Sequence, residues 1–270
     1  LVAAIIWGSG YLFSKQATNA GMHAGTINAI RGLIYAALAY LFFHKAINKM
    51  TKVDLRIGLT AGLINFLGYQ IQTIGLMYTT PANNALLTAI YVVIIPFIVW
   101  IFFHKRPEPK SYLAILICMV GMIFLTNIIG QGFSIHIGDL LTILSALFYA
   151  LQIVYFGMTA TDSNPWILSF MLGVTQGGFG LIWSLLFEHG TYATVDWKAG
   201  IWPAVILGFT DPTPAGIILM TESMFGSIFS VVFGFEPFTE NLFIGGVLII
   251  IALLIMQLNF RKMWFTHHKI

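Results

Sequence analysis

The chain has 270 residues, of which 58% are hydrophobic and only 9% are charged, and its mean hydropathy is +0.87. Soluble domains carry about 25% charged residues, so a water-soluble fold of this length is excluded. The formal net charge of +3 does not indicate nucleic-acid binding, because no basic stretch with interleaved aromatic residues occurs. The composition therefore predicts an all-α, polytopic membrane protein.

Apolar runs separated by polar residues, Pro or Gly predict ten membrane spans. The first run begins directly at Leu1, without Met or a basic leader, so we expect a helix whose start lies upstream rather than a signal peptide. All but the eighth run approach or exceed the length needed to cross a hydrocarbon core of about 30 Å. The approximate ranges are 1–20, 26–44, 55–77, 82–103, 111–128, 139–158, 165–187, 200–210, 214–235 and 241–260.

The eighth run is too short to cross, because a helix rises only about 1.5 Å per residue. In the first half of the chain the long helix-forming stretch LINFLGYQIQTIGLMYTT separates Gly62 from Pro81. In the second half only five residues separate Gly208 from Pro214. If these glycines correspond, roughly a dozen residues are absent. Three explanations are open: residues left out of the sequence, an engineered deletion, or a natural protein with nine spans. We favour residues left out of the sequence.

Lys and Arg gather in alternate connections between the spans. Only Lys15 and Lys198 fall on the opposite side, and Arg31 lies within a span. The positive-inside rule then predicts that both termini are cytoplasmic. The basic residues on the predicted cytoplasmic side are Lys45, Lys49, Lys52, Arg56, Lys105, Arg106, Lys110, Arg261, Lys262 and Lys269.

The chain also contains an internal repeat. Aligning Pro81 with Pro214 matches Leu86 to Leu219, and the two segments share the opening T-P-A. Chance similarity between apolar helices is the alternative, but a five-span unit that is repeated once must be inverted, as in many transporters. We therefore predict two inverted five-helix repeats, at 1–128 and 139–260, followed by a basic cytoplasmic tail at 261–270.

Several stretches follow one another in a distinctive order. These are IIWGSGYLFSKQA, GLMYTTPANNALLTAIYVVIIPFIVWIFFHKRP, LAILICMVGMIFL and DPTPAGIILMTESMFGSIFSVVFGFEPFT. In this order the chain resembles EamA-type members of the drug/metabolite transporter superfamily. Glu222 and Glu236 stand on the two Glu positions of the ninth-helix pattern, and Ser223 stands where Pro is frequent. The resemblance implies ten helices in two inverted repeats, a central cavity, and substrates such as amino acids, other metabolites, drugs or nucleotide sugars.

Two ionisable residues are predicted well inside spans, where a charge costs about 2.5–3.5 kcal/mol or more. Arg31 lies in the second span and Glu222 in the ninth. Glu222 could bind a cationic group, take up a proton or pair with Arg31, and an interhelical hydrogen bond is its structural alternative. Arg31 could also snorkel or form a fixed pair. Both are predicted substrate-binding residues.

Polar side chains recur at helical spacing in the third, fourth, sixth and seventh spans. These faces are expected to turn from lipid toward a shared cavity, because unpaired amides are penalised in hydrocarbon. The alternative is that they serve as hydrogen-bonding glue between helices. The predicted cavity residues are Asn65, Tyr69, Gln72, Asn84, Thr88, Tyr91, Tyr149, Gln152 and Gln176.

Trp7 and Tyr11 lie one turn apart in the first span and are further substrate-binding candidates. Their rings could stack on a substrate or hold a cation by cation–π contact. Placement in the interfacial aromatic belt is the alternative.

Glycine spacing predicts where helices pack closely. Gly58 and Gly62 in the third span, and Gly173 and Gly177 in the seventh, each form a G-x-x-x-G pair. Pro96 predicts a kink in the fourth span, because it removes a backbone hydrogen bond.

These features predict a transporter of a small organic metabolite, either an amino acid or a neutral or cationic compound. The resemblance implies export as the direction and a bacterial inner membrane as the location. Alternating access around a midplane cavity is the expected mechanism, with protons as a candidate co-substrate. A structural or sensory subunit is one alternative. An intramembrane enzyme is disfavoured, because H-E-x-x-H, G-x-S-x-G and paired intramembrane carboxylates are absent from the sequence. No cofactor or metal is predicted, and the oligomeric state stays open.

Overall fold

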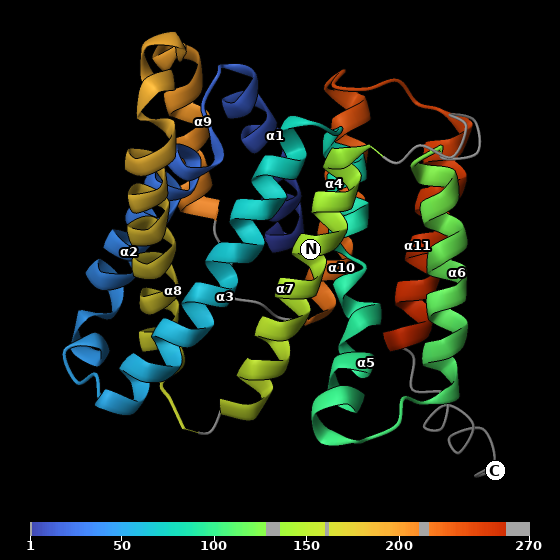
Figure 1. The fold of residues 1–270 in the computed structure, drawn as a ribbon, viewed down its shortest axis with the longest axis horizontal. Coiled ribbons are helices and arrows are strands. Elements are labelled where there is room, and N and C mark those ends of the chain that lie inside the picture. Colours follow the sequence, from blue (N-terminus) through green and yellow to red (C-terminus); the bar gives the residue numbers. More distant parts are fainter. Residues whose placement is uncertain (1, 128–135, 160–161, 211–215, 258–270) are drawn as a thin grey trace.

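The computed structural model describes residues 2–127, 136–159, 162–210 and 216–257, with side chains from 8–127, 136–159, 162–209 and 223–256 (Figure 1). Within these ranges the chain is helical and contains no strand, so the predicted all-α class is confirmed. The helices in chain order are α1 (Val2–Asn19), α2 (Ala24–Ile47), α3 (Lys52–Met77), α4 (Pro81–Thr88), α5 (Tyr91–Phe103), α6 (Pro109–Leu125), α7 (Ile137–Thr159), α8 (Pro165–Trp183), a π-helix (Ser184–Glu188), a 3-10 helix (His189–Thr194), α9 (Trp197–Thr210), α10 (Gly216–Val232) and α11 (Glu240–Gln257).

Local sequence fixes where several helices begin. Thr51 and Asp54 form a reciprocal capping box at the start of α3. The hydroxyl of Thr80 caps α4, whose first residue is Pro81, and the side chain of Asn164 caps α8. Proline is well placed at a first helical position, because its missing N–H would have no partner there.

The predicted fourth span is broken into α4 and α5. The break lies at Ala89 and Ile90, well before Pro96, the residue at which the sequence predicted a kink. Its physical cause is local: the Thr88 hydroxyl donates to the Asn84 carbonyl, a back-bond that bends helices. The following turn tightens, since the Ile90 N–H bonds the carbonyl three residues earlier instead of four.

Four helical stretches of the described chain are long and apolar enough to cross a membrane. They are Ala24–Ile47, Pro81–Phe103, Ile137–Thr159 and Pro165–Thr194, and shorter apolar helices accompany them. The count of ten spans stays a prediction. The predicted short eighth span begins slightly earlier than expected, at Trp197, and α9 has 14 residues, which corresponds to about 21 Å of rise.

Glycines bring α2 and α8 into backbone contact. A Cβ atom added to Gly32 would lie 2.2 Å from the backbone nitrogen of Gly177, and one added to Gly173 would lie 2.8 Å from the nitrogen of Ala36. Small residues permit such approaches in membrane helices.

The predicted glycine pair of α3 packs on α8 as well. A Cβ on Gly58 would lie 2.6 Å from Cβ of Met171, and one on Gly62 would lie 1.9 Å from the hydroxyl of Thr175. The close packing predicted for both G-x-x-x-G pairs is therefore confirmed.

The remaining contacts place α1 and α3 in the interior of the bundle. Helix α3 packs on α7 and α8, while α1 packs on α9 and α10. Helices α6 and α11 pack together at one edge, and α2 and α8 lie at the other (Figure 1). Asn65, Gln70, Gln72 and Thr73 of α3 are consequently buried against neighbouring helices.

Candidate solute-binding site

The centre of the polar interior is a ring cluster on α3. The guanidinium carbon of Arg31 lies 4.0 Å from the centroid of the Tyr69 ring, a cation–π contact between α2 and α3. The Tyr149 ring of α7 meets Tyr69 edge-on, with centroids 5.3 Å apart. Arg31 is buried, whereas Tyr69 and Tyr149 are half-buried. The sequence had predicted all three as substrate-binding residues, and the structure brings them together.

Gln72 joins this cluster to α4 and α7. Its Oε1 accepts a hydrogen bond from the Tyr149 hydroxyl at 2.8 Å, and its Nε2 donates to the Thr88 hydroxyl at 2.8 Å. The Tyr91 ring of α5 packs edge-on against Tyr149, with centroids 6.4 Å apart. The break between α4 and α5 therefore lies beside the ring cluster, where Thr88 both bends the helix and accepts from Gln72. We call Arg31, Tyr69, Gln72, Thr88 and Tyr149 the central site.

Asn84 extends the hydrogen bonds from the central site toward the other end of α4. It is fully buried, and its Nδ2 donates to the Thr142 hydroxyl at 2.8 Å and to the Gln72 carbonyl at 3.3 Å. Its Oδ1 has no partner among the described residues. The sequence prediction missed Thr142, although this residue lies two turns before Tyr149 on the same face of α7.

A second cluster consists of four buried amides, and we call it the amide cluster. Asn28 of α2 donates to Gln70 of α3 at 2.9 Å, and Gln176 of α8 donates to Asn28 at 3.4 Å. Asn65 of α3 donates to Gln176 at 3.4 Å. The predicted residues Asn65 and Gln176 are thus hydrogen-bonded to each other, together with two residues that the prediction did not include.

The other predicted residues lie apart from these two clusters or outside the described side chains. Tyr11 is buried in α1 next to Gly226 of α10, and Gln152 is buried in α7, one turn beyond Tyr149. The side chains of Trp7 and Glu222 lie outside the described residues.

A carboxylate that the prediction did not include is buried at the start of α2. The Oε1 of Glu188 accepts from the Gly25 N–H at 2.7 Å, and its Oε2 accepts from the Thr26 N–H at 2.8 Å and from the Thr26 hydroxyl at 2.9 Å. A carboxylate at a helix N-terminus satisfies free N–H groups. The π-helix after α8 brings Glu188 to this position, one residue beyond the predicted span.

The turn between α3 and α4 is held by side chains from other helices. Lys15 of α1 donates to the carbonyls of Leu76, at 2.7 Å, and Thr79, at 2.8 Å. The Thr79 hydroxyl donates to Asp139 of α7 at 2.5 Å. On the other side of the turn, Glu236 accepts from the Ala82 N–H at 3.0 Å. We call this segment, residues 76–82, the clamped turn.

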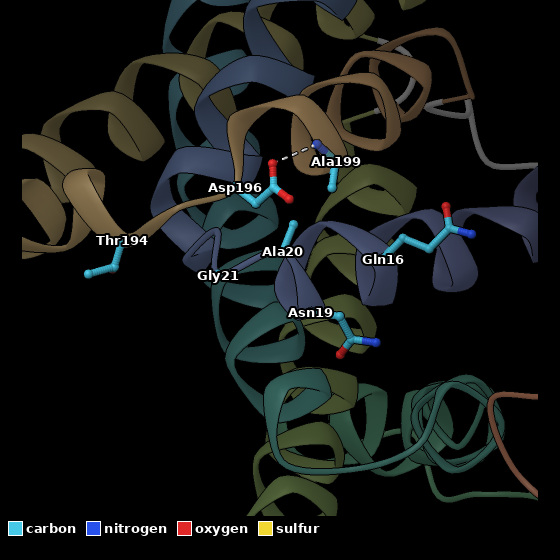
Figure 2. A pocket seen from close by; sticks show the side chains of 7 residues that line it. All are labelled: Gln16, Asn19, Ala20, Gly21, Thr194, Asp196 and Ala199. Carbon is cyan, nitrogen blue, oxygen red and sulfur yellow. Dashed lines mark hydrogen bonds between the residues drawn. The ribbon is translucent and has the colours of Figure 1, made fainter.

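A pocket of ≈ 560 Å³ opens between the end of α1 and the start of α9 (Figure 2). Its carboxylate, Asp196, accepts from the backbone N–H of Ala199 and so caps α9. None of the predicted site residues lines this pocket, so it is distinct from the central site. The lining residues are Gln16, Asn19, Ala20, Gly21, Thr194, Asp196 and Ala199.

Comparison with known proteins defines the class of protein. Residues 1–127 match the EamA-like transporter family. An "Uncharacterized transporter" of Archaeoglobus fulgidus is 30% identical over 273 residues, which cover 96% of this chain and 84% of that protein. A solved crystal structure shares the fold, with a TM-score of 0.59 and 16% identity over 95% of this chain and 98% of its own. The chain is an integral membrane transporter.

It belongs to the EamA-like transporter family, which confirms the resemblance found in the sequence. An alignment of 273 positions that covers 96% of a 270-residue chain must contain positions at which the relative has residues and this chain has none.

Among the described residues, no group of three or more His, Cys, Asp or Glu side chains is arranged to hold a metal ion.

Proposed function

We propose that this transporter exports a small organic metabolite by alternating access between two inverted five-helix halves, 1–128 and 139–260. The packing of the helices supports two related halves. In the proposed halves α1 corresponds to α7, α2 to α8, α3 to α9, α4 and α5 to α10, and α6 to α11. When each helix is exchanged for its counterpart, the α3–α7 contact becomes α9–α1, and the α3–α8 contact becomes α9–α2. The contacts α2–α8, α4–α10 and α6–α11 map onto themselves. Helices related in this way are expected of inverted repeats.

The composition of the central site is the observation that carries the proposal. Arg31, Tyr69, Gln72 and Thr88 come from the proposed first half, and Tyr149 comes from the second. Relative movement of the halves would change the hydrogen bond between Tyr149 and Gln72. The contacts of a solute bound at this point would therefore differ between the state that is open to the cytoplasm and the state that is open to the outside.

The chemistry of the central site favours a small solute with a carboxylate and an apolar or aromatic part. A guanidinium recognises carboxylates through paired hydrogen bonds. Tyrosine rings offer faces for apolar groups and for an ammonium, and the amide of Gln72 offers a donor and an acceptor. An amino acid combines these groups. Multiply charged phosphates are less suited, because Arg31 is the cation of the central site.

The clamped turn is the proposed outer closure. Lys15 from α1 and Asp139 from α7 both bind it, and these helices occupy equivalent positions in the two halves. Opening toward the outer side would require these contacts to separate. In the proposed orientation both termini are cytoplasmic and the clamped turn faces outward, in a bacterial inner membrane.

Solute flux into proteoliposomes, measured with a panel of radiolabelled amino acids, tests the proposal. The Arg31→Gln variant is expected to lose most of the flux, because it removes the cation that would hold the carboxylate of the solute. Arg106→Gln is the matched control, since it makes the same chemical change at an exposed arginine in the connection between α5 and α6. The control is expected to keep the wild-type flux.

Further outcomes separate this proposal from its alternatives. Flux that Arg31→Gln leaves unchanged would contradict the central site, and absence of flux across a broad solute panel would favour a structural or sensory subunit. Recovery of chemically altered solute would indicate an enzyme. Proton coupling is tested with Glu222→Gln: if its flux keeps the wild-type dependence on pH, Glu222 does not carry the proton.

A further inference from the structure

The connection between α2 and α3 carries exposed basic side chains without acidic partners. Lys45, Lys49, Lys52 and Arg56 are all exposed, and none forms a salt bridge within the described part of the chain. The acidic residue of this segment, Asp54, is buried and accepts hydrogen bonds at the start of α3 and from the residue before α8. The four cations of the connection therefore have no ion-pair partner within the described part of the chain.

One face of α3 continues from these charges into an apolar stripe. Lys52, Arg56, Leu59 and Leu63 follow one another at spacings of four, three and four, which places them on the same face of a helix. All four are exposed, Leu59 by 45% and Leu63 by 43%. The seven residues from Arg56 to Leu63 rise by about 10 Å, so the two leucines can reach into one leaflet while the two basic residues lie at the level of the headgroups.

We propose that this stripe binds an anionic two-chain phospholipid. The phosphate of the headgroup contacts Lys52 and Arg56, with Lys45 and Lys49 adding to the local field, and an acyl chain lies along Leu59. Charge complementarity selects the occupant, because a zwitterionic lipid brings no net negative charge to the unneutralised cations. The inference depends on membrane insertion and not on the proposed transport.

The connection between α5 and α6 offers a natural comparison. It also carries basic residues, Lys105, Arg106 and Lys110, but the Lys110 amine lies 3.4 Å from the carboxylate of Glu108 and donates to the Met256 carbonyl. This second basic region is therefore partly neutralised. A double substitution there removes two charges without touching the stripe on α3.

The experiment compares three proteins, each full-length and purified in detergent: wild type, the Lys52→Gln/Arg56→Gln double variant, and the Lys105→Gln/Arg106→Gln control. Each is titrated with phosphatidylglycerol, phosphatidylcholine or inorganic phosphate, and thermal unfolding is recorded. Bound ligand raises the unfolding temperature by mass action. Each lost cation weakens the attraction by about 1 kcal/mol, so the α3 double variant is expected to bind phosphatidylglycerol about 30-fold more weakly.

The outcomes are distinct. Stabilisation of wild type and control by phosphatidylglycerol, with a loss in the α3 variant, supports the proposal. Equal binding by the α3 variant, equal losses in both variants, or equal stabilisation by phosphatidylcholine or by inorganic phosphate would each overturn it. Native mass spectrometry counts bound lipids directly, so a variant with lowered intrinsic stability still gives a readable result.

Discussion

The central site and the amide cluster both use polar side chains of α3, yet they differ in accessibility and surroundings. In the amide cluster every member is at most 5% exposed and hydrogen-bonds another amide, between helices whose backbones touch at glycines. In the central site the rings of Tyr69 and Tyr149 are half-buried. Buried amides therefore join helices in one region, whereas half-buried tyrosine rings accompany the amide of Gln72 in the other.

The largest effect is expected where the helix backbones touch. In Gly32→Ala, the new Cβ would lie 2.2 Å from the backbone nitrogen of Gly177, which cannot rotate away. Overpacking of this kind costs about 1–3 kcal/mol or more, so the unfolding temperature and the folded yield in detergent are expected to fall. Gly178→Ala is the control, because its Cβ meets nothing within 4 Å. Equal stability of the two variants would contradict close contact of α2 and α8.

The amide cluster is expected to matter for stability and not for solute affinity. Asn28→Leu keeps the branched shape of the side chain but removes the donor to Gln70 and the acceptor for the Gln176 amide N–H. An unsatisfied buried polar group costs about 1–3 kcal/mol. Thermal unfolding should report this loss, while the KM of the remaining folded transporter should stay at the wild-type value. A raised KM would assign this cluster to the solute site.

The central site is expected to show the opposite behaviour. Tyr149→Phe removes the donor to Gln72 and keeps the ring against Tyr69, so stability should fall by about 1 kcal/mol or less. If the hydroxyl orients Gln72 for the solute, affinity should drop about tenfold, the equivalent of about 1.4 kcal/mol. Tyr155→Phe makes the same chemical change elsewhere on α7 and should leave affinity unchanged.

Helical spacing was sufficient to predict the face that carries Tyr69 and Gln72, because side chains three or four residues apart project together. It could not predict that Gln70, about 100° away from Tyr69, faces Asn28, since the relative register of α2 and α3 depends on where the glycines of each helix meet α8. The break after Thr88 was missed for another reason. Pro96 was the stronger local signal, whereas the bend follows from a side-chain bond to the backbone.

The most direct view of motion is expected at the clamped turn. Lys15→Met removes two donated hydrogen bonds from the Leu76 and Thr79 carbonyls, and stability should fall by about 1 kcal/mol. If these bonds hold an outer closure, an Asn83→Cys reporter in a Cys118→Ser background should react several-fold faster with a polar maleimide. Lys15→Arg retains a cation and donors and should react at the wild-type rate. An unchanged rate in Lys15→Met would mean that the bonds support the fold without closing a passage, because a closure must become more accessible when its fastening is removed.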